Sequence, residues 1–127
     1  MGIRMHMAKE WKERHLPTWD YDYSRIVRFY PKTYFHNNHQ HDIEVWFRNH
    51  FDIGYEFFFS RSEDTGVPCE VGKGALNAVI NNPKWFKEAV DEALSAGFAD
   101  SEDEIRDFIK DALASDCDND IVRVVFY

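Results

Sequence analysis

"NNPKWFKEAVDEALSAGF" (residues 81–98) contains the clearest helix signals in the chain. Asn82 has the side chain of an N-cap, and Pro83 suits the first helical position because its missing N–H needs no partner there. Gly97 can end the helix in a left-handed conformation. The apolar residues recur at helical spacing and predict one face packed on a core: Trp85, Phe86, Ala89, Val90, Ala93 and Leu94.

A second amphipathic helix is predicted directly after the first, in "SEDEIRDFIKDALAS" (residues 101–115). Ser101 and Glu104 have the spacing of a capping box, in which each side chain accepts a backbone N–H of the first turn. The apolar stripe of this helix comprises Ile105, Phe108, Ile109, Ala112 and Leu113. We therefore expect two antiparallel helices joined by a short loop.

Strand-like composition marks four other segments of the chain. Three lie before the helices, "RIVRFY" (25–30), "DIEVWFR" (42–48) and "YEFFFSR" (55–61), and all are rich in β-branched and aromatic residues. The turn residues of "NHFDIG" predict a hairpin between the second and the third. The last segment, "DIVRVVFY" (120–127), also has strand character.

Two shorter helices are expected outside the helical pair. "AKEWKERHL" (8–16) has helical spacing and ends before Pro17, and "GALNAVI" (74–80) ends at an Asn-Asn-Pro break. The predicted fold is a single α+β domain over residues 1–127. Its mostly antiparallel four-stranded sheet consists of a three-strand meander and the C-terminal strand, with the α-helical hairpin packed on one face.

Length and composition limit the class of protein. A chain of 127 residues, 44% hydrophobic and 17% aromatic, can bury a core without disulfides or metal. No window approaches 18 consecutive apolar residues and the start lacks the apolar run of a signal peptide, so we expect a cytoplasmic protein without membrane contact. Cys69 and Cys117 are far apart and lack CxxC spacing, which argues against a disulfide framework.

The charge is distributed unevenly along the chain. The formal net charge is -8, while residues 1–61 hold nine Lys or Arg against eight Asp or Glu. Residues 88–120 hold twelve acids against two bases, Arg106 and Lys110, a net charge of -10. Such a surface favours association with a cationic protein and disfavours nucleic acid, because phosphates are repelled.

A histidine-rich stretch, "YFHNNHQHD" (34–42), raises the question of a metal site. In an extended segment His39 and His41 project to one face, and a turn can bring His36 to the same divalent ion, such as zinc. A fourth ligand would come from His15, Cys69 or an acid. The alternative is a polar loop, since Asn37, Asn38 and Gln40 are ordinary turn residues.

Motifs for other chemistry fail on inspection. "GVPCEVGKG" has five residues between Gly66 and Gly72 and Gly74 after Lys73, which excludes a P-loop. "DCDND" resembles the start of an EF-hand loop, but Ile121 stands where glycine is required. No local signature of nucleophilic catalysis accompanies Cys69, so an enzyme is not the preferred hypothesis.

One face of the predicted sheet offers a further alternative. If the other face packs on the helices, this one presents Arg, Trp and Tyr side chains that bind proteins or stack unpaired RNA bases. A covering element would instead make the same residues a second core layer. The set comprises Arg28, Tyr30, Glu44, Trp46, Arg48, Glu56, Phe58, Arg123 and Tyr127.

The leading hypothesis is a non-enzymatic binding protein whose acidic helical face docks on a basic protein. An immunity protein for a nuclease toxin, or a phage-type inhibitor of a host nucleic-acid-processing enzyme, would have this character. No cofactor is required; the alternative is a metal-binding module or metal-dependent enzyme at the histidines. The residues expected to bind the partner are Glu88, Asp91, Asp103, Glu104, Asp107 and Asp111, with Trp46 and Trp85 as anchors.

Overall fold

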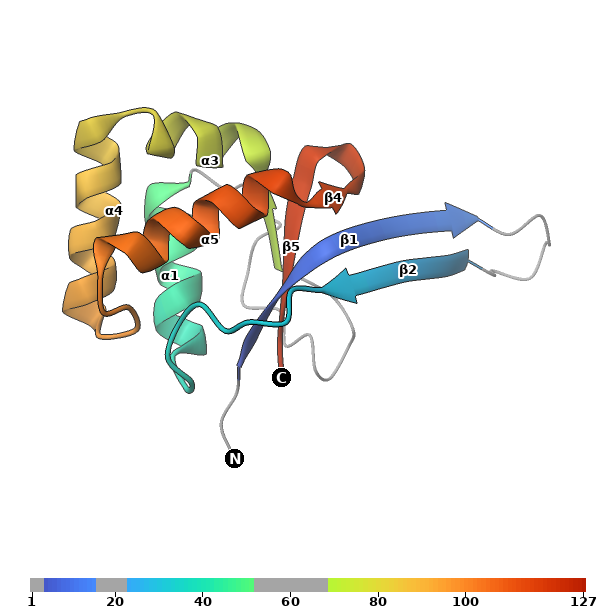
Figure 1. Ribbon diagram of the computed structural model, residues 1–127, viewed down its shortest axis with the longest axis horizontal. Helices are drawn as coiled ribbons and strands as arrows, with labels where there is room; N and C mark the ends of the chain where they lie inside the picture. Colours follow the sequence, from blue (N-terminus) through green and yellow to red (C-terminus); the bar gives the residue numbers. More distant parts are fainter. Residues whose placement is uncertain (1–3, 16–22, 52–68) are drawn as a thin grey trace.

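The fold is taken from a computed structural model that describes residues 4–15, 23–51 and 69–127 (Figure 1). Helices and strands are both present, and the predicted α+β class with a mostly antiparallel sheet is confirmed. In chain order the elements are β1 (Met5–His15), β2 (Tyr23–Phe29), α1 (Gln40–His50), β3 (Cys69–Gly72), α3 (Lys73–Ile80), α4 (Pro83–Ala96), α5 (Glu102–Ala114), β4 (Asp116–Cys117), a 3-10 turn (Asp118–Asp120) and β5 (Ile121–Phe126).

Strand β1 is central to the sheet. The strand order is β2-β1-β5-β3, with antiparallel neighbours throughout, and the two-residue β4 pairs with β1 in parallel. The register of β1 against β2 shifts between Ala8 and Glu10, a β-bulge. Beyond it, β1 and β2 project together away from the helices (Figure 1).

The helix predicted over residues 8–16 is wrong, because this segment forms most of β1. Its Lys and Glu residues favour a helix locally, which explains the error. The segment is hydrogen-bonded to β2 on one side and to β5 on the other, and this pairing stabilises the strand by more than the local preference stabilises a helix. Met5 and Met7 point into the main core, whereas Ala8 and Trp11 pack on the other face of the sheet.

The strand predicted over residues 42–48 is also wrong, since the segment lies within helix α1. Ile43, Trp46 and Phe47 are buried, and their spacing is that of one helical face rather than of a strand. The predicted meander therefore lacks its second strand. The third predicted strand, 55–61, lies outside the described residues.

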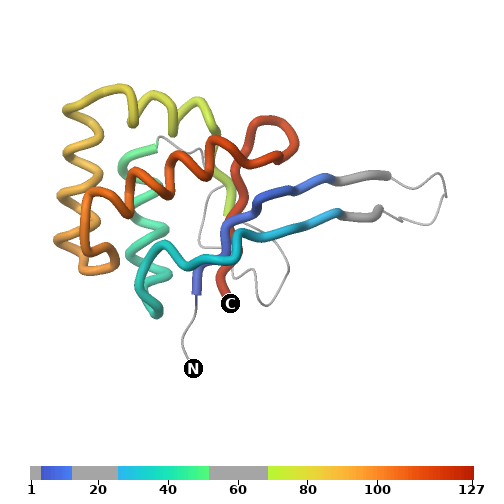
Figure 2. Tube along the Cα trace, in the orientation of Figure 1, coloured from blue at the N-terminus to red at the C-terminus, as the bar shows by residue number. Residues whose placement is uncertain are grey.

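The helices 83–96 and 102–114 and the short helix at 73–80 are confirmed. The Asn82 side chain accepts hydrogen bonds from the backbone N–H groups of Lys84 and Trp85 at 3.1 and 3.2 Å. Gly97 adopts the expected left-handed conformation with φ of 84°. After the turn α5 runs obliquely back toward the sheet instead of alongside α4 (Figures 1 and 2).

Two hydrophobic clusters hold these layers together. The main core lies between the helices and the sheet and contains an aromatic group of Phe35, Trp46, Phe98 and Phe108 with ring centroids 5.0 to 6.2 Å apart. A smaller cluster on the other face consists of Ala8, Trp11, Cys117 and Val125. Part of that face is thus buried, but none of these four residues belongs to the set that the alternative interpretation of the sheet expected to form a second core layer.

Candidate functional site

The inner row of acids on α5 is engaged within the chain itself. Asp111 accepts hydrogen bonds from Lys32 Nζ at 2.7 Å and from the Tyr34 hydroxyl at 2.6 Å. The Tyr30 hydroxyl donates to the Asp111 backbone oxygen at 2.9 Å. Glu104 accepts the backbone N–H of Asp100 at 3.1 Å, one residue before the N-cap Ser101, so the predicted capping box forms in a shifted version. These contacts attach the segment after β2 to α5.

The electrostatics of this contact favour a charged Asp111. Burial by itself would raise the pKa of Asp111, but the hydrogen bonds from Lys32 and Tyr34 outweigh it and hold the pKa below its usual value. Burial and the same hydrogen bond raise the pKa of the Tyr34 phenol. Lys32 also lies over the Tyr34 ring, with Nζ 4.9 Å from the centroid. Asp111 therefore stabilises the fold, a role that sequence spacing did not indicate.

The outer side of the helices carries acids of a different kind. Asp103 and Asp107 on α5, and Glu88 on α4, are exposed. None of the three forms an ion pair with another residue in the described parts of the chain. Asp91 is exposed as well but pairs with Lys87 at 2.7 Å. The six predicted acids thus form two sets. Asp91, Glu104 and Asp111 have partners within the chain, and Glu88, Asp103 and Asp107 are exposed without an ion pair among the described residues.

Trp85 and Glu88 lie together at a hollow where α4 begins and α1 ends. Trp85 is 49% exposed, and the hollow of about 280 Å³ is completed by Arg48, Asn49 and His50. Of these lining residues, the Asn49 amide donates to Glu92 at 3.0 Å, and His50 Nε2 lies 3.1 Å from the other Glu92 oxygen. An exposed tryptophan beside a hollow has the character of an interface anchor.

Trp46, the other predicted anchor, is inaccessible. Its side chain is 0% exposed, and Nε1 donates to the Ala89 backbone oxygen at 2.8 Å. The prediction placed Trp46 on a sheet face, whereas in α1 its side chain points between helices into the core. Trp46 can therefore contact a partner only after unfolding.

The predicted Arg, Trp and Tyr surface of the sheet does not form as expected. Glu44 and Trp46 belong to a helix, and Arg123 is only 5% exposed. The Arg123 guanidinium lies over the Trp11 ring at 5.6 Å and donates to Glu70 and to the Asp118 backbone oxygen at 3.3 and 3.2 Å. Glu56 and Phe58 lie outside the described residues, and among the described members of this set Arg28, Arg48 and Tyr127 are exposed.

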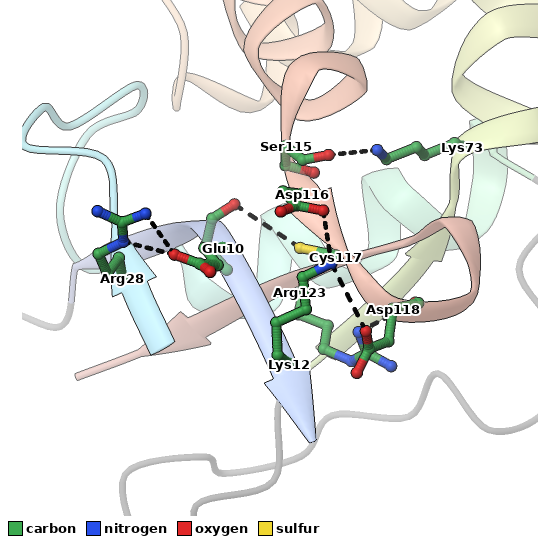
Figure 3. Close-up of polar contacts among 10 residues, drawn as sticks. Glu10, Lys12, Arg28, Lys73, Ser115, Asp116, Cys117, Asp118 and Arg123 are labelled. Atoms are coloured by element: carbon green, nitrogen blue, oxygen red, sulfur yellow. Dashed lines mark hydrogen bonds and ion pairs between the residues drawn. The ribbon is translucent and has the colours of Figure 1, made fainter. Parts of the chain in front are cut away.

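A polar cluster ties the acidic turn after α5 to β1 (Figure 3). Lys12 lies 2.6 Å from Asp116 and 3.9 Å from Asp118, and the hydrogen bond to Asp116 raises the pKa of Lys12. Arg28 pairs with Glu10 at 2.5 Å, and Lys73 donates to the Ser115 backbone oxygen. Two of the acids in "DCDND" therefore serve as partners for a lysine of the same chain.

The three histidines of the metal hypothesis are placed differently from the extended segment that was assumed. His36 lies 2.9 Å from Asp100, and this hydrogen bond raises the pKa of His36. His39 is the N-cap of α1, 2.9 Å from Asp42, and His41 is in the first turn. In a helix, residues two apart point to nearly opposite sides. Within the described ranges no group of three or more His, Cys, Asp and Glu is placed to hold a metal ion.

Comparison with known proteins adds no functional information. No protein-family model matches the chain, and the searches of curated proteins and of solved structures return no significant match. Among the helices that the structure describes, none is long and apolar enough to cross a membrane.

Proposed function

We propose that this protein is a non-enzymatic binding domain that docks on a basic protein through the exposed acids of α4 and α5. A nuclease or another nucleic-acid-processing enzyme is the partner class, so the protein would act as an immunity protein or a phage-type inhibitor. The observation that carries the proposal is the set of exposed acids without an ion pair in the described chain, Glu88, Asp103 and Asp107.

Electrostatics supports this proposal in two ways. Like charges at positions 103 and 107 are neighbours on one helix and repel each other, a cost that a cationic partner would relieve. A surface of one sign also raises the association rate with an opposite charge, by about tenfold to a thousandfold at low salt. Both effects act on Asp103 and Asp107, whose carboxylates face solvent.

Trp85 supplies the apolar part of the proposed interface. Charged rims steer association, whereas affinity depends on a few buried anchors, among which tryptophan is enriched. Trp85 lies one helical turn from Glu88, and both line the hollow at the end of α1. A partner side chain that filled this hollow would bury the indole next to a carboxylate.

The first experiment is a pull-down from lysate of the source organism, washed at low and then high salt, with mass spectrometry of the bound proteins. The association and dissociation rates of the captured protein are then measured by surface plasmon resonance. We expect the double variant Asp103→Lys/Asp107→Lys to slow association about tenfold or more at low salt. We expect Trp85→Ala to increase the dissociation rate, with a loss of about 2 kcal/mol in binding free energy.

A matched pair of variants separates local docking from the effect of total charge. Asp107→Asn and Asp120→Asn each remove one exposed negative charge, from α5 and from the turn before β5 respectively. Only Asp107→Asn is expected to slow association. Equal rates for the two variants, or an unchanged rate for the double lysine variant, would contradict the proposal.

A further inference from the structure

A second hollow lies where the start of β1, the segment after β2 and the first turn of α5 meet. Its volume is about 410 Å³, within the range of small-molecule sites, about 300–1,000 Å³. The lining residues are Arg4, Thr33, Tyr34, Phe35, His36, Asn37 and Glu104. Tyr34 and Phe35 are buried in the core, so the accessible lining is mainly polar.

Backbone hydrogen bonds hold the walls of this hollow in place. Arg4 exchanges two hydrogen bonds with Tyr127, at 2.9 and 3.0 Å, which attach it to the end of β5. The His36 backbone N–H donates to the Phe98 oxygen at 2.9 Å, and the His36 ring bonds Asp100. Glu104 is positioned by the cap of α5. The backbone of Arg4, the His36 ring and the Glu104 carboxylate are therefore held in place before any ligand arrives.

Two opposite charges line the hollow without meeting. Arg4 and Glu104 do not pair with one another, and neither forms an ion pair with any other residue in the described part of the chain. The Arg4 guanidinium presents the planar donors that match a carboxylate. One Glu104 oxygen bonds the Asp100 N–H, which leaves the second oxygen as an acceptor for a cation.

We propose that this hollow binds a free α-amino acid, with the ligand carboxylate on Arg4 and the ligand ammonium group on Glu104. A ligand with a single charge would cover the opposite charge of the site without compensating it, which costs free energy. A zwitterion compensates both. Thr33 and Asn37 add a hydroxyl and an amide for further hydrogen bonds.

This inference is independent of the proposed docking function, which rests on Glu88, Asp103, Asp107 and Trp85 and not on Glu104. It also assigns a role to Arg4, which the composition of the chain did not single out. His36 Nε2 is already bonded to Asp100, so Arg4, with its fork of planar donors, is assigned as the main contact for the carboxylate.

The test is isothermal titration calorimetry on the full chain with the twenty standard amino acids as probes. Acetate and methylammonium are titrated as half-ligands, each with one of the two charged groups. We expect at least one amino acid to bind about tenfold or more tightly than either half-ligand, because two charge-assisted contacts form together.

Variants then assign the two contacts. Arg4→Ala and Glu104→Gln are each expected to lower amino-acid affinity about tenfold. Glutamine keeps the acceptor for the helix cap, so the second variant is expected to fold. Asp120→Asn removes an exposed charge from the turn before β5, which does not line the hollow, and as a matched control should leave the affinity unchanged. Absence of binding by all twenty probes, equal binding of acetate, or an equal effect of the control would each overturn the proposal.

Discussion

The inner and outer sides of the helical layer, formed by α1, α4 and α5, carry the same residue types in opposite roles. Trp46 is 0% exposed and bonded to the backbone of α4, whereas Trp85 is 49% exposed beside a hollow. Asp111 binds Lys32 and Tyr34, whereas Asp107, one turn earlier on α5, faces solvent. Residue type alone therefore does not distinguish a residue that stabilises the fold from one that is available to a partner.

The tryptophan pair tests this contrast with the largest expected effect. Trp46→Ala removes a fully buried side chain and its hydrogen bond, so we expect a loss of about 3–5 kcal/mol in the free energy of unfolding. Trp85→Ala should cost less than about 1 kcal/mol, since half of the side chain is already in water. Urea denaturation followed by circular dichroism measures both. Similar losses of unfolding free energy for the two variants would contradict the distinction between a buried Trp46 that stabilises the fold and an exposed Trp85.

The aspartate pair tests the contrast at a smaller scale. Asp111→Ala deletes the acceptor for a lysine and a tyrosine, and we expect a loss of about 1–2 kcal/mol after allowance for solvent screening. Asp107→Ala should change stability by no more than about 0.5 kcal/mol. The readout is the same denaturation experiment at neutral pH. An Asp107 effect as large as that of Asp111 would show that the outer carboxylate also supports the fold.

The dependence of stability on pH gives the smallest and most specific signal. The pKa of folded Asp111 lies below its usual value of 3.8, so its contribution is present above that pH and is lost as pH falls through the folded pKa. We expect Asp111→Asn to flatten the fall in unfolding free energy below pH 3.8, relative to wild type. Asp107→Asn serves as the control, and its curve should follow that of wild type. Parallel curves for all three proteins would exclude the Asp111 contribution.

Local signals predicted the C-terminal half of the fold well. Asn82, Gly97 and Ser101 cap the helices as expected, because capping depends on residues within one turn. The N-terminal half was predicted poorly. The segment 8–16 was expected to be a helix and contributes to strand β1, and the segment 42–48 was expected to be a strand and lies in helix α1. In both segments the pattern was short and the neighbouring elements decided the outcome.

The candidate sites show the same division. The sequence identified the surplus of acids and the anchor Trp85, since both are features of composition and spacing. It did not identify Lys32, Tyr34 or Arg4, because their contacts join residues 77 to 123 positions apart and no periodicity links such segments. The three histidines suggested a metal site only on the assumption that residues 34–42 form an extended segment, and helix α1 begins within it.

By itself, the sequence determined the α+β class, the short helix α3, the capped helices α4 and α5, the final strand and the concentration of negative charge in the C-terminal half. These properties follow from local backbone preferences, apolar periodicity and residue counts, which need no knowledge of distant contacts. Only the tertiary structure decided that β1 is a strand and α1 a helix, that Trp46 is buried, and which acids are paired. Burial and pairing depend on which distant segments pack together, and packing energy exceeds the local preference of a short segment.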